Sequence, residues 1–211
     1  MHSQGTNAPP TTGHVLHMAR WYDLLGHIIS LGHDNAVREK LVDLAAPLPG
    51  ETALDVGCGT GTLALAMESR QGTVQVHGID ASPEMIDVAR EKATKAGSQV
   101  DFQVALIEAI PFPDATFDLV TSSMMLHHLP DGLKRAGLAE IRRVLKPGGR
   151  FMAMDFAAQS HSPLGHLLSI FGHAHGESTI EKLTPMLRDA GFSVIEGIST
   201  THKNFSFIRA R

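Results

Sequence analysis

Alternating strand-like and helix-like segments constrain the fold of this chain more than any other feature. Short apolar segments occur at residues 52–56, 73–79, 100–105, 117–122 and 150–156, and segments with helical spacing separate most of them. Such alternation favours a parallel sheet with helices on both faces. In sheets of this kind, ligands bind beyond the carboxyl ends of the strands. We therefore expect an α/β fold with a site at that edge.

The ends of the expected helices show clear signals. Ser82 and Pro83 are a typical N-cap and first-turn pair, and they open one expected helix. Asp131 opens another, and we expect the run 146–149 (Lys-Pro-Gly-Gly) to stop it in a tight turn before the strand at 150–156. A shorter helix is expected at 63–68.

The remaining segments are expected to frame the sheet. Residues 1–14 are polar, contain two adjacent prolines and are expected to be a flexible tail. Residues 15–211 are expected to form a single domain. Helices within 15–48 cap it, and an irregular insert at 157–177 forms a lid. After the insert we expect a helix at 178–190 and strands at 192–199 and 204–209.

Composition excludes several classes of function. The 211 residues carry 18 basic and 22 acidic side chains, so no overall positive field attracts nucleic acid or anionic membranes. The sequence contains no run of 18 apolar residues, so it predicts no membrane-spanning helix. Cys58 is the only cysteine, which excludes an internal disulfide and a zinc site with several thiolates. The N-terminus has no apolar segment typical of a secretory signal, and we expect a cytoplasmic protein.

The run 54–61 (Leu-Asp-Val-Gly-Cys-Gly-Thr-Gly) is the sharpest motif. Gly57, Gly59 and Gly61 directly follow a predicted strand, so a ligand can approach the backbone and the N–H groups of the next helix. The dinucleotide fingerprint has a glycine where this chain has Thr62, which argues against a nicotinamide-dependent oxidoreductase. A carboxylate at Asp55 would repel a pyrophosphate but suits a ligand with an ammonium group.

Asp80 is the second candidate binding residue. It ends the second predicted strand, nineteen residues beyond Gly61. A carboxylate at that place accepts hydrogen bonds from ribose hydroxyls in nucleotide-binding α/β folds. The alternative is that Asp80 only caps the turn at Ser82 and Pro83.

Four motifs in order resemble those of class I S-adenosylmethionine-dependent methyltransferases. They are LDVGCGTG (54–61), GIDASPEMIDVAR (78–90), IPFPDATFDLVTSSMMLHHLPD (110–131) and RVLKPGGR (143–150). The region of Tyr22 and Asp23 more loosely resembles ubiquinone/menaquinone-biosynthesis-type C-methyltransferases. The resemblance implies a Rossmann-like, seven-stranded mixed sheet with an antiparallel last strand and an N-terminal helical cap. It also implies methyl transfer from S-adenosylmethionine to a small, partly apolar acceptor.

The resemblance also implies which residues hold the cofactor. Asp55 would lie near its amino group, the loop 57–61 beside its methionine part, and Asp80 at its ribose. The remaining implied positions are Ala81 and Met85 flanking the adenine, Ser122 and Ser123 at the methionine end, Cys58 within the glycine loop, and Tyr22 closing the pocket.

One departure from the family pattern concerns the adenine. Where the family usually reads Gly-Asp-Ala, this chain reads Ala105-Leu106-Ile107. Leu106 cannot accept a hydrogen bond from the adenine amino group, although the backbone N–H of Ile107 can still bond the ring. Loss of such a bond costs about 0.5–1.5 kcal/mol. A cofactor-binding regulator, or a degenerate methyltransferase without turnover, therefore stays an alternative.

Histidines supply the candidate acid–base chemistry. His127 lies just past the fourth predicted strand and is the candidate catalytic base; the alternative is that His127 and His128 only pack the turn before Asp131. Four more histidines (His161, His166, His173 and His175) lie in the insert. They are solvated or capping groups, or else metal ligands, and we expect no metal.

Overall fold

The structure is a computed structural model that describes residues 34–71, 73–157, 179–202 and 205–211. The expected tail at 1–14, the first part of the expected helical cap, with Tyr22, and all of the insert but residue 157 lie outside the described residues.

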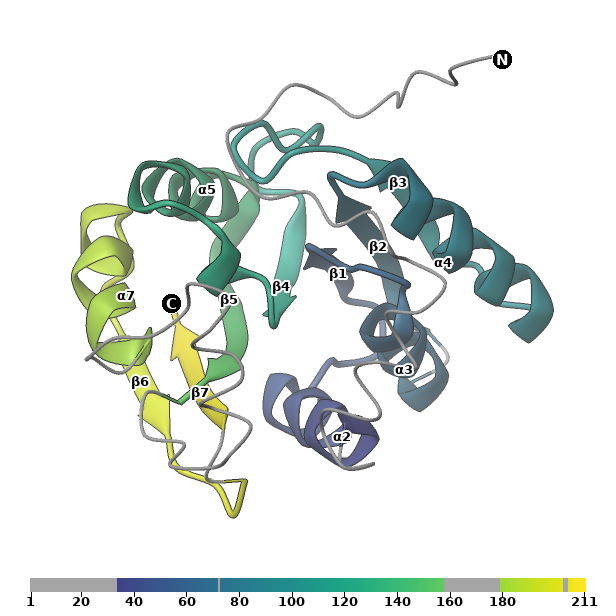
Figure 1. The fold of residues 1–211 in the computed structure, drawn as a ribbon, viewed down its shortest axis with the longest axis horizontal. Coiled ribbons are helices and arrows are strands. Elements are labelled where there is room, and N and C mark those ends of the chain that lie inside the picture. The colour runs from purple at the N-terminus through teal and green to yellow at the C-terminus, as the bar shows by residue number, and fades with distance from the viewer. Residues whose placement is uncertain (1–33, 72, 158–178, 203–204) are drawn as a thin grey trace, which may run out of the picture.

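A seven-stranded sheet with the order β3-β2-β1-β4-β5-β7-β6 forms the centre of the molecule (Figure 1). Five strands pair in parallel, whereas β7 is antiparallel to both β5 and β6. The expected mixed sheet with an antiparallel last strand is therefore confirmed. The strands are β1 (Thr52–Val56), β2 (Gln75–Asp80), β3 (Asp101–Val104), β4 (Phe117–Ser123), β5 (Leu145–Phe156), β6 (Ile195–Ile198) and β7 (Phe205–Ala210).

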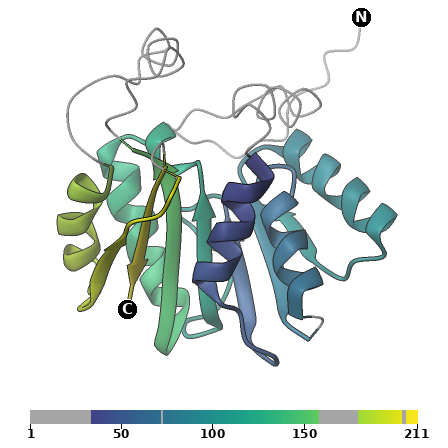
Figure 2. The ribbon, with the colours of Figure 1, turned by 90° about the horizontal axis from the view of Figure 1, so that it is seen from below.

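Helices cover both faces of the sheet, and each face has its own core. One cluster of buried residues joins α2, α3 and α4 to the sheet, and the other joins α5 and α7 to it. Figure 2 shows α2 and α3 side by side in front of the strands. The helices are α2 (Asp34–Ala45), α3 (Thr62–Gln71), α4 (Pro83–Ala96), the 3-10 turn η1 (Leu126–His128), α5 (Asp131–Val144) and α7 (Thr179–Asp189).

The strand order reverses between β1 and β4. From β1 the chain continues to β2 and β3 on one side, whereas β4 and β5 lie on the other. The carboxyl ends of β1 and β4 therefore flank a topological switch point, the usual ligand-binding place in such sheets. This point lies between Val56 and Ser123, where the glycine loop leaves the sheet.

Three predicted boundaries were wrong. The run 146–149 does not separate α5 from β5, because β5 already begins at Leu145, which pairs with Phe117. The register then shifts before Leu119 pairs with Arg150. Gly148, with its φ of +81°, lies within this irregular stretch. The helix expected at 63–68 extends over Thr62–Gln71, and the strand expected at 192–199 is only Ile195–Ile198.

Helix α4 begins as its sequence predicts. The Ser82 hydroxyl accepts a hydrogen bond from the Met85 N–H at 3.3 Å, and Pro83 occupies the first turn. Gly97 closes the helix with a φ of +66°. Because Ser82 itself caps α4, the end of β2 is held at a fixed position beside the helix.

Arg150 holds the chain together near the start of β1, at the end of that strand away from the glycine loop. Its Nε donates to the Ala45 carbonyl at 2.8 Å and one Nη to the Ala46 carbonyl at 2.7 Å, while both Nη atoms contact the Glu51 carboxylate at 2.8 Å. The Arg150 hydrogen bond lowers the pKa of Glu51. This cluster joins the end of α2 to the start of β1 and lies away from the glycine loop.

Candidate cofactor-binding site

The glycine loop is fixed to the neighbouring strand β2. The N–H groups of Gly57 and Cys58 both donate to the Ile79 carbonyl, at 2.8 and 3.0 Å. Gly57, Gly59 and Gly61 have φ values of +71°, +54° and +78°. Such left-handed conformations are costly for residues with a side chain. The spacing of the three glycines therefore follows from the path of the backbone.

The three glycines differ in what surrounds them. A Cβ at Gly57 would lie 2.5 Å from Cγ of Met125, and one at Gly61 would lie 2.6 Å from the Phe102 ring. A Cβ at Gly59 would meet nothing within 4 Å. Gly57 and Gly61 therefore allow close internal packing, whereas Gly59 presents its bare backbone to open space, as a site for a bound ligand requires.

Asp80 joins the end of β2 to the glycine loop. One carboxylate oxygen accepts from the Gly59 N–H and the other from the Ser82 N–H, each at 2.9 Å. Burial raises the pKa of Asp80, and the two backbone hydrogen bonds act against that rise. Each oxygen of an ionised carboxylate has further lone pairs, so Asp80 can still accept from a ligand hydroxyl. Its contact with Ser82 shows that it also supports the turn before α4.

Asp55 is a buried carboxyl group at the end of β1. It is 1% exposed and accepts a hydrogen bond from the Thr121 hydroxyl at 2.9 Å. Burial raises the pKa of Asp55 to about 7, and the Thr121 hydrogen bond and the charge of Arg38 oppose that rise. Its protonation therefore changes near neutral pH, which is unusual for an aspartate.

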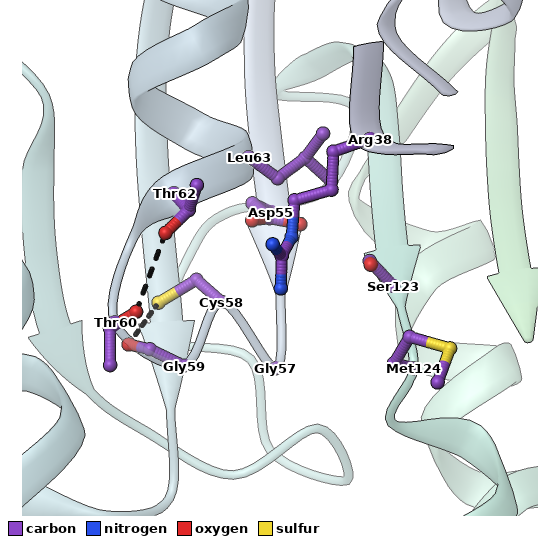
Figure 3. Close-up of a pocket in the computed structure, with 10 residues that line it drawn as sticks. All are labelled: Arg38, Asp55, Gly57, Cys58, Gly59, Thr60, Thr62, Leu63, Ser123 and Met124. Carbon is purple, nitrogen blue, oxygen red and sulfur yellow. Dashed lines mark hydrogen bonds between the residues drawn. The ribbon is translucent and has the colours of Figure 1, made fainter. Parts of the chain in front are cut away.

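A pocket opens where the glycine loop faces the end of β4 (Figure 3). Figure 3 shows Arg38 reaching from α2 past Asp55 into the space between the loop and Ser123. A cation and a carboxyl group therefore face the same pocket. Its lining residues are Arg38, Asp55, Gly57, Cys58, Gly59, Thr60, Thr62, Leu63, Ser123 and Met124.

Five of the predicted cofactor-binding residues line this pocket: Asp55, Gly57, Cys58, Gly59 and Ser123. The Cys58 side chain is buried, and burial raises the pKa of its thiol, so its backbone is the part suited to contact a ligand. Sequence reasoning missed Arg38. It is one of several charged residues on an amphipathic helix, and no local signal distinguishes it.

The other predicted residues within the described part of the chain are not among those that line this pocket. Ala81 and buried Met85 follow Asp80. Leu106 forms an isolated bridge with Ala109. The Ile107 side chain packs inward against α5, because a Cβ on Gly137 would lie 2.5 Å from it. Within the described residues, the buried Ser122 hydroxyl has no hydrogen-bond partner.

His127 forms a close pair with a residue that sequence reasoning missed. Its ring nitrogen Nδ1 lies 2.6 Å from one carboxylate oxygen of Asp155, and its backbone N–H donates to the other at 2.9 Å. Asp155 is 3% exposed and lies near the end of β5. A signal was present in the sequence, because Asp155 follows an apolar strand segment just as Asp55 and Asp80 do.

In the described part of the chain, no three histidine, cysteine, aspartate or glutamate side chains gather as a metal ion would need. The four insert histidines lie outside the described residues. Among the described helices, none has the length and apolar character to cross a lipid bilayer.

The sheet order, the glycine loop and the acidic strand ends together define a class I S-adenosylmethionine-dependent methyltransferase, and the chain belongs to this family. Residues 53–149 match the family model described as a methyltransferase domain. The demethylmenaquinone methyltransferase of Thermus thermophilus is 37% identical over 150 residues, which cover 71% of this chain and 67% of that protein.

Two further relatives extend the comparison. The ubiquinone/menaquinone biosynthesis C-methyltransferase UbiE of Enterobacter sp. is 30% identical over 92% of this chain and 90% of that protein. The crystal structure of a SAM-dependent methyltransferase from Aquifex aeolicus superposes with a TM-score of 0.68 and 25% identity, covering 82% of this chain and 88% of that one. Against several other curated relatives, the match spans between 54% and 64% of their length.

Proposed function

We propose that this protein transfers a methyl group from S-adenosylmethionine to a small-molecule acceptor. The observation that carries the proposal is the bare face of Gly59 at the switch point of the sheet. Its N–H donates to Asp80, and it lines the same pocket as Asp55. Family membership supports the same activity and does not favour a nicotinamide-dependent oxidoreductase.

The side chains present fit the cofactor. An amino acid carries an ammonium and a carboxylate group, and the pocket offers the Asp55 carboxyl group and the Arg38 guanidinium as opposite charges. Gly57 and Gly59 leave the backbone open beside them. Asp80 keeps lone pairs for ribose hydroxyls. Each polar part of S-adenosylmethionine except the adenine amino group therefore has a side-chain partner of suitable chemistry.

When bound, the cofactor supplies an electrophilic methyl group on a positively charged sulfur. The task of the chain is to hold the acceptor in line with that methyl group and to exclude water. Such positioning contributes up to about 7–11 kcal/mol to lowering a barrier. The rigid loop, fixed to Ile79 and Asp80, is suited to this task because its backbone is already in place before any ligand binds.

We further propose a quinone-type acceptor, since the relatives are named as methyltransferases of demethylmenaquinone and of ubiquinone/menaquinone biosynthesis. Met124, at the pocket wall, offers an apolar and adaptable surface for a ring. A cytoplasmic location and the absence of a nucleic-acid partner, both predicted from composition, belong to the same proposal.

Calorimetric titration with S-adenosylmethionine, S-adenosylhomocysteine and NAD tests the cofactor. We expect the first two to bind and Asp80→Asn to weaken them about 10–100-fold, the equivalent of a hydrogen bond to a charged group. Asp101→Asn is the matched control, because this exposed carboxylate begins β3 at the far edge of the sheet. Unchanged affinity in Asp80→Asn would remove the ribose assignment.

Methyl transfer to a panel of quinols, phenols and amines then tests turnover. Transfer to a quinol supports the proposal of a quinone-type acceptor. Tight cofactor binding with no transfer to any member of the panel would instead favour the binding regulator that the Leu106 departure suggests.

A further inference from the structure

We infer that Asp155 positions His127 as the base that removes a proton from the acceptor, and that the acceptor therefore enters the site with a neutral hydroxyl group. This inference rests on the proposed methyl transfer and adds to it the chemistry of the acceptor and a positioning residue that sequence analysis did not find.

The first support is that one buried carboxylate contacts the same residue twice. One oxygen of Asp155 lies 2.6 Å from Nδ1 of His127, and the other accepts the His127 backbone N–H at 2.9 Å. Asp155 is 3% exposed, and the His127 side chain is 17% exposed. A carboxylate that only capped η1 would need the backbone contact alone. The second contact fixes the orientation of the ring.

The hydrogen bond assigns the tautomer of the histidine. A carboxylate accepts, so Nδ1 donates and carries the hydrogen in the neutral ring. Nε2 then keeps its lone pair and is the atom that can accept a proton. A neighbouring carboxylate also stabilises the imidazolium that forms when Nε2 takes that proton.

The second support is the place of η1 beside the pocket. Ser123 and Met124 line the pocket, and η1 begins two residues later at Leu126. Met124 adopts a left-handed φ of +56°, and its N–H donates to the Met154 carbonyl at 2.9 Å. A strained residue of this kind persists only where the surroundings hold it, and such residues gather at functional sites.

These contacts fasten η1 to the end of β5 at two consecutive residues, Met154 and Asp155. The turn that carries His127 is therefore held at the rim of the pocket by the strand next to β4. In the strand order, β4 and the turn that follows it lie on the other side of β1 from β2, which ends in Asp80. This is the side left for an acceptor when the cofactor ribose lies at Asp80.

The chemical step balances without a further reactant. The acceptor hydroxyl gives its proton to Nε2 of His127, and the acceptor's electron pair forms a bond to the methyl carbon. The bond between that carbon and sulfur breaks, and its electron pair stays on sulfur, which loses its positive charge. The imidazolium beside Asp155 later releases the proton to water. An acceptor that is already ionised would need no such base.

The test uses the full chain and two variants, Asp155→Asn and His127→Gln. Both are compared with wild type on the best hydroxyl acceptor of the panel and on its nitro-substituted analogue, which is ionised at pH 8. We expect each variant to lower kcat for the neutral acceptor about 10²–10⁴-fold, the usual contribution of a general base. Turnover of the ionised analogue and KM for S-adenosylmethionine should stay within about threefold.

Two measurements separate positioning from a structural role. The double variant should be no slower than His127→Gln, because Asp155 acts through the ring. ¹⁵N NMR, with the His127 signal assigned from its absence in His127→Gln, should show the hydrogen on Nδ1 in wild type and a mixture of tautomers in Asp155→Asn. His127→Gln keeps the backbone hydrogen bond to Asp155. If Asp155→Asn does not fold, the comparison of neutral and ionised acceptors is made with His127→Gln alone.

An equal loss of kcat for the neutral and the ionised acceptor would overturn the inference. An NMR spectrum of wild type that shows the ring hydrogen of His127 on Nε2 would also overturn it. If S-adenosylmethionine binds and only amines are methylated, the inference about the acceptor fails while the proposed function stands. If S-adenosylmethionine does not bind, the proposed function itself fails.

Discussion

Replacing Asp55 by asparagine should stabilise the ligand-free protein, and the gain should grow with pH. Asp55 is 1% exposed, and burial raises its pKa from 3.8 to about 7. The folded chain therefore binds the Asp55 proton more tightly than the unfolded chain does. That contribution to stability is fully present below pH 3.8 and is lost as the pH rises through 7, because the charged form is costly to bury.

The magnitude follows from the two pKa values. Each pKa unit is equivalent to about 1.4 kcal/mol, so the cost of ionisation in the folded state approaches about 4 kcal/mol at pH 8. At pH 5 the folded group is already neutral while the unfolded one is ionised, and the cost is about 2 kcal/mol. Asparagine can still accept the Thr121 hydrogen bond and carries no charge in either state, so Asp55→Asn removes this cost.

Guanidinium-induced unfolding at pH 5 and pH 8 measures the difference. The free energy of unfolding of Asp55→Asn should exceed that of wild type by about 2 kcal/mol at pH 5 and about 4 kcal/mol at pH 8. Asp118→Asn is a matched control, and its effect on the free energy of unfolding should have the opposite sign. Hydrogen bonds from Lys146 and the Thr52 N–H lower the pKa of Asp118 despite partial burial. A constant difference between Asp55→Asn and wild type at the two pH values would refute the reasoning.

Three further substitutions test the loop and the packing around it. Gly57→Ala forces a Cβ onto a φ of +71° and against Met125, so it should lower the unfolding free energy by about 1–3 kcal/mol and abolish cofactor binding in calorimetry. Arg150→Met removes the contacts that join α2 to β1; denaturant titration should show a loss of about 2–4 kcal/mol with cofactor affinity unchanged. Gly137→Ala drives a Cβ into Ile107 and should cost about 1–3 kcal/mol, less when combined with Ile107→Ala in a double-variant cycle.

The parts of the site that local sequence determines were predictable. The loop glycines follow from the turn between β1 and α3, and Asp80 follows from its place at the end of an apolar strand. Each feature lies within its own strand–turn–helix unit, the loop between β1 and α3 and Asp80 between β2 and α4. The motif spacing therefore determines their geometry before any long-range packing is known.

The parts that depend on long-range contacts were not predictable in the same way. Arg38 enters the pocket only because α2 packs beside α3, and nothing in its own helix marks it. Asp155 meets His127 only because β5 pairs with β4, and the irregular start of β5 concealed the register. The role of each of these residues depends on a neighbour from another element, which the periodicity of a single segment does not reveal.

The pairing of β7 sets the order in which the site can be completed during synthesis. The strands around the glycine loop are contained within residues 52–123, so they can associate as soon as that stretch leaves the ribosome. Asp155 instead lies on a strand whose outer edge stays open until residues 205–210 arrive, and Ser206 is its partner in register. A growing chain can thus assemble the strands around the glycine loop early, whereas Asp155 gains its neighbouring strand only when residues 205–210 have been made.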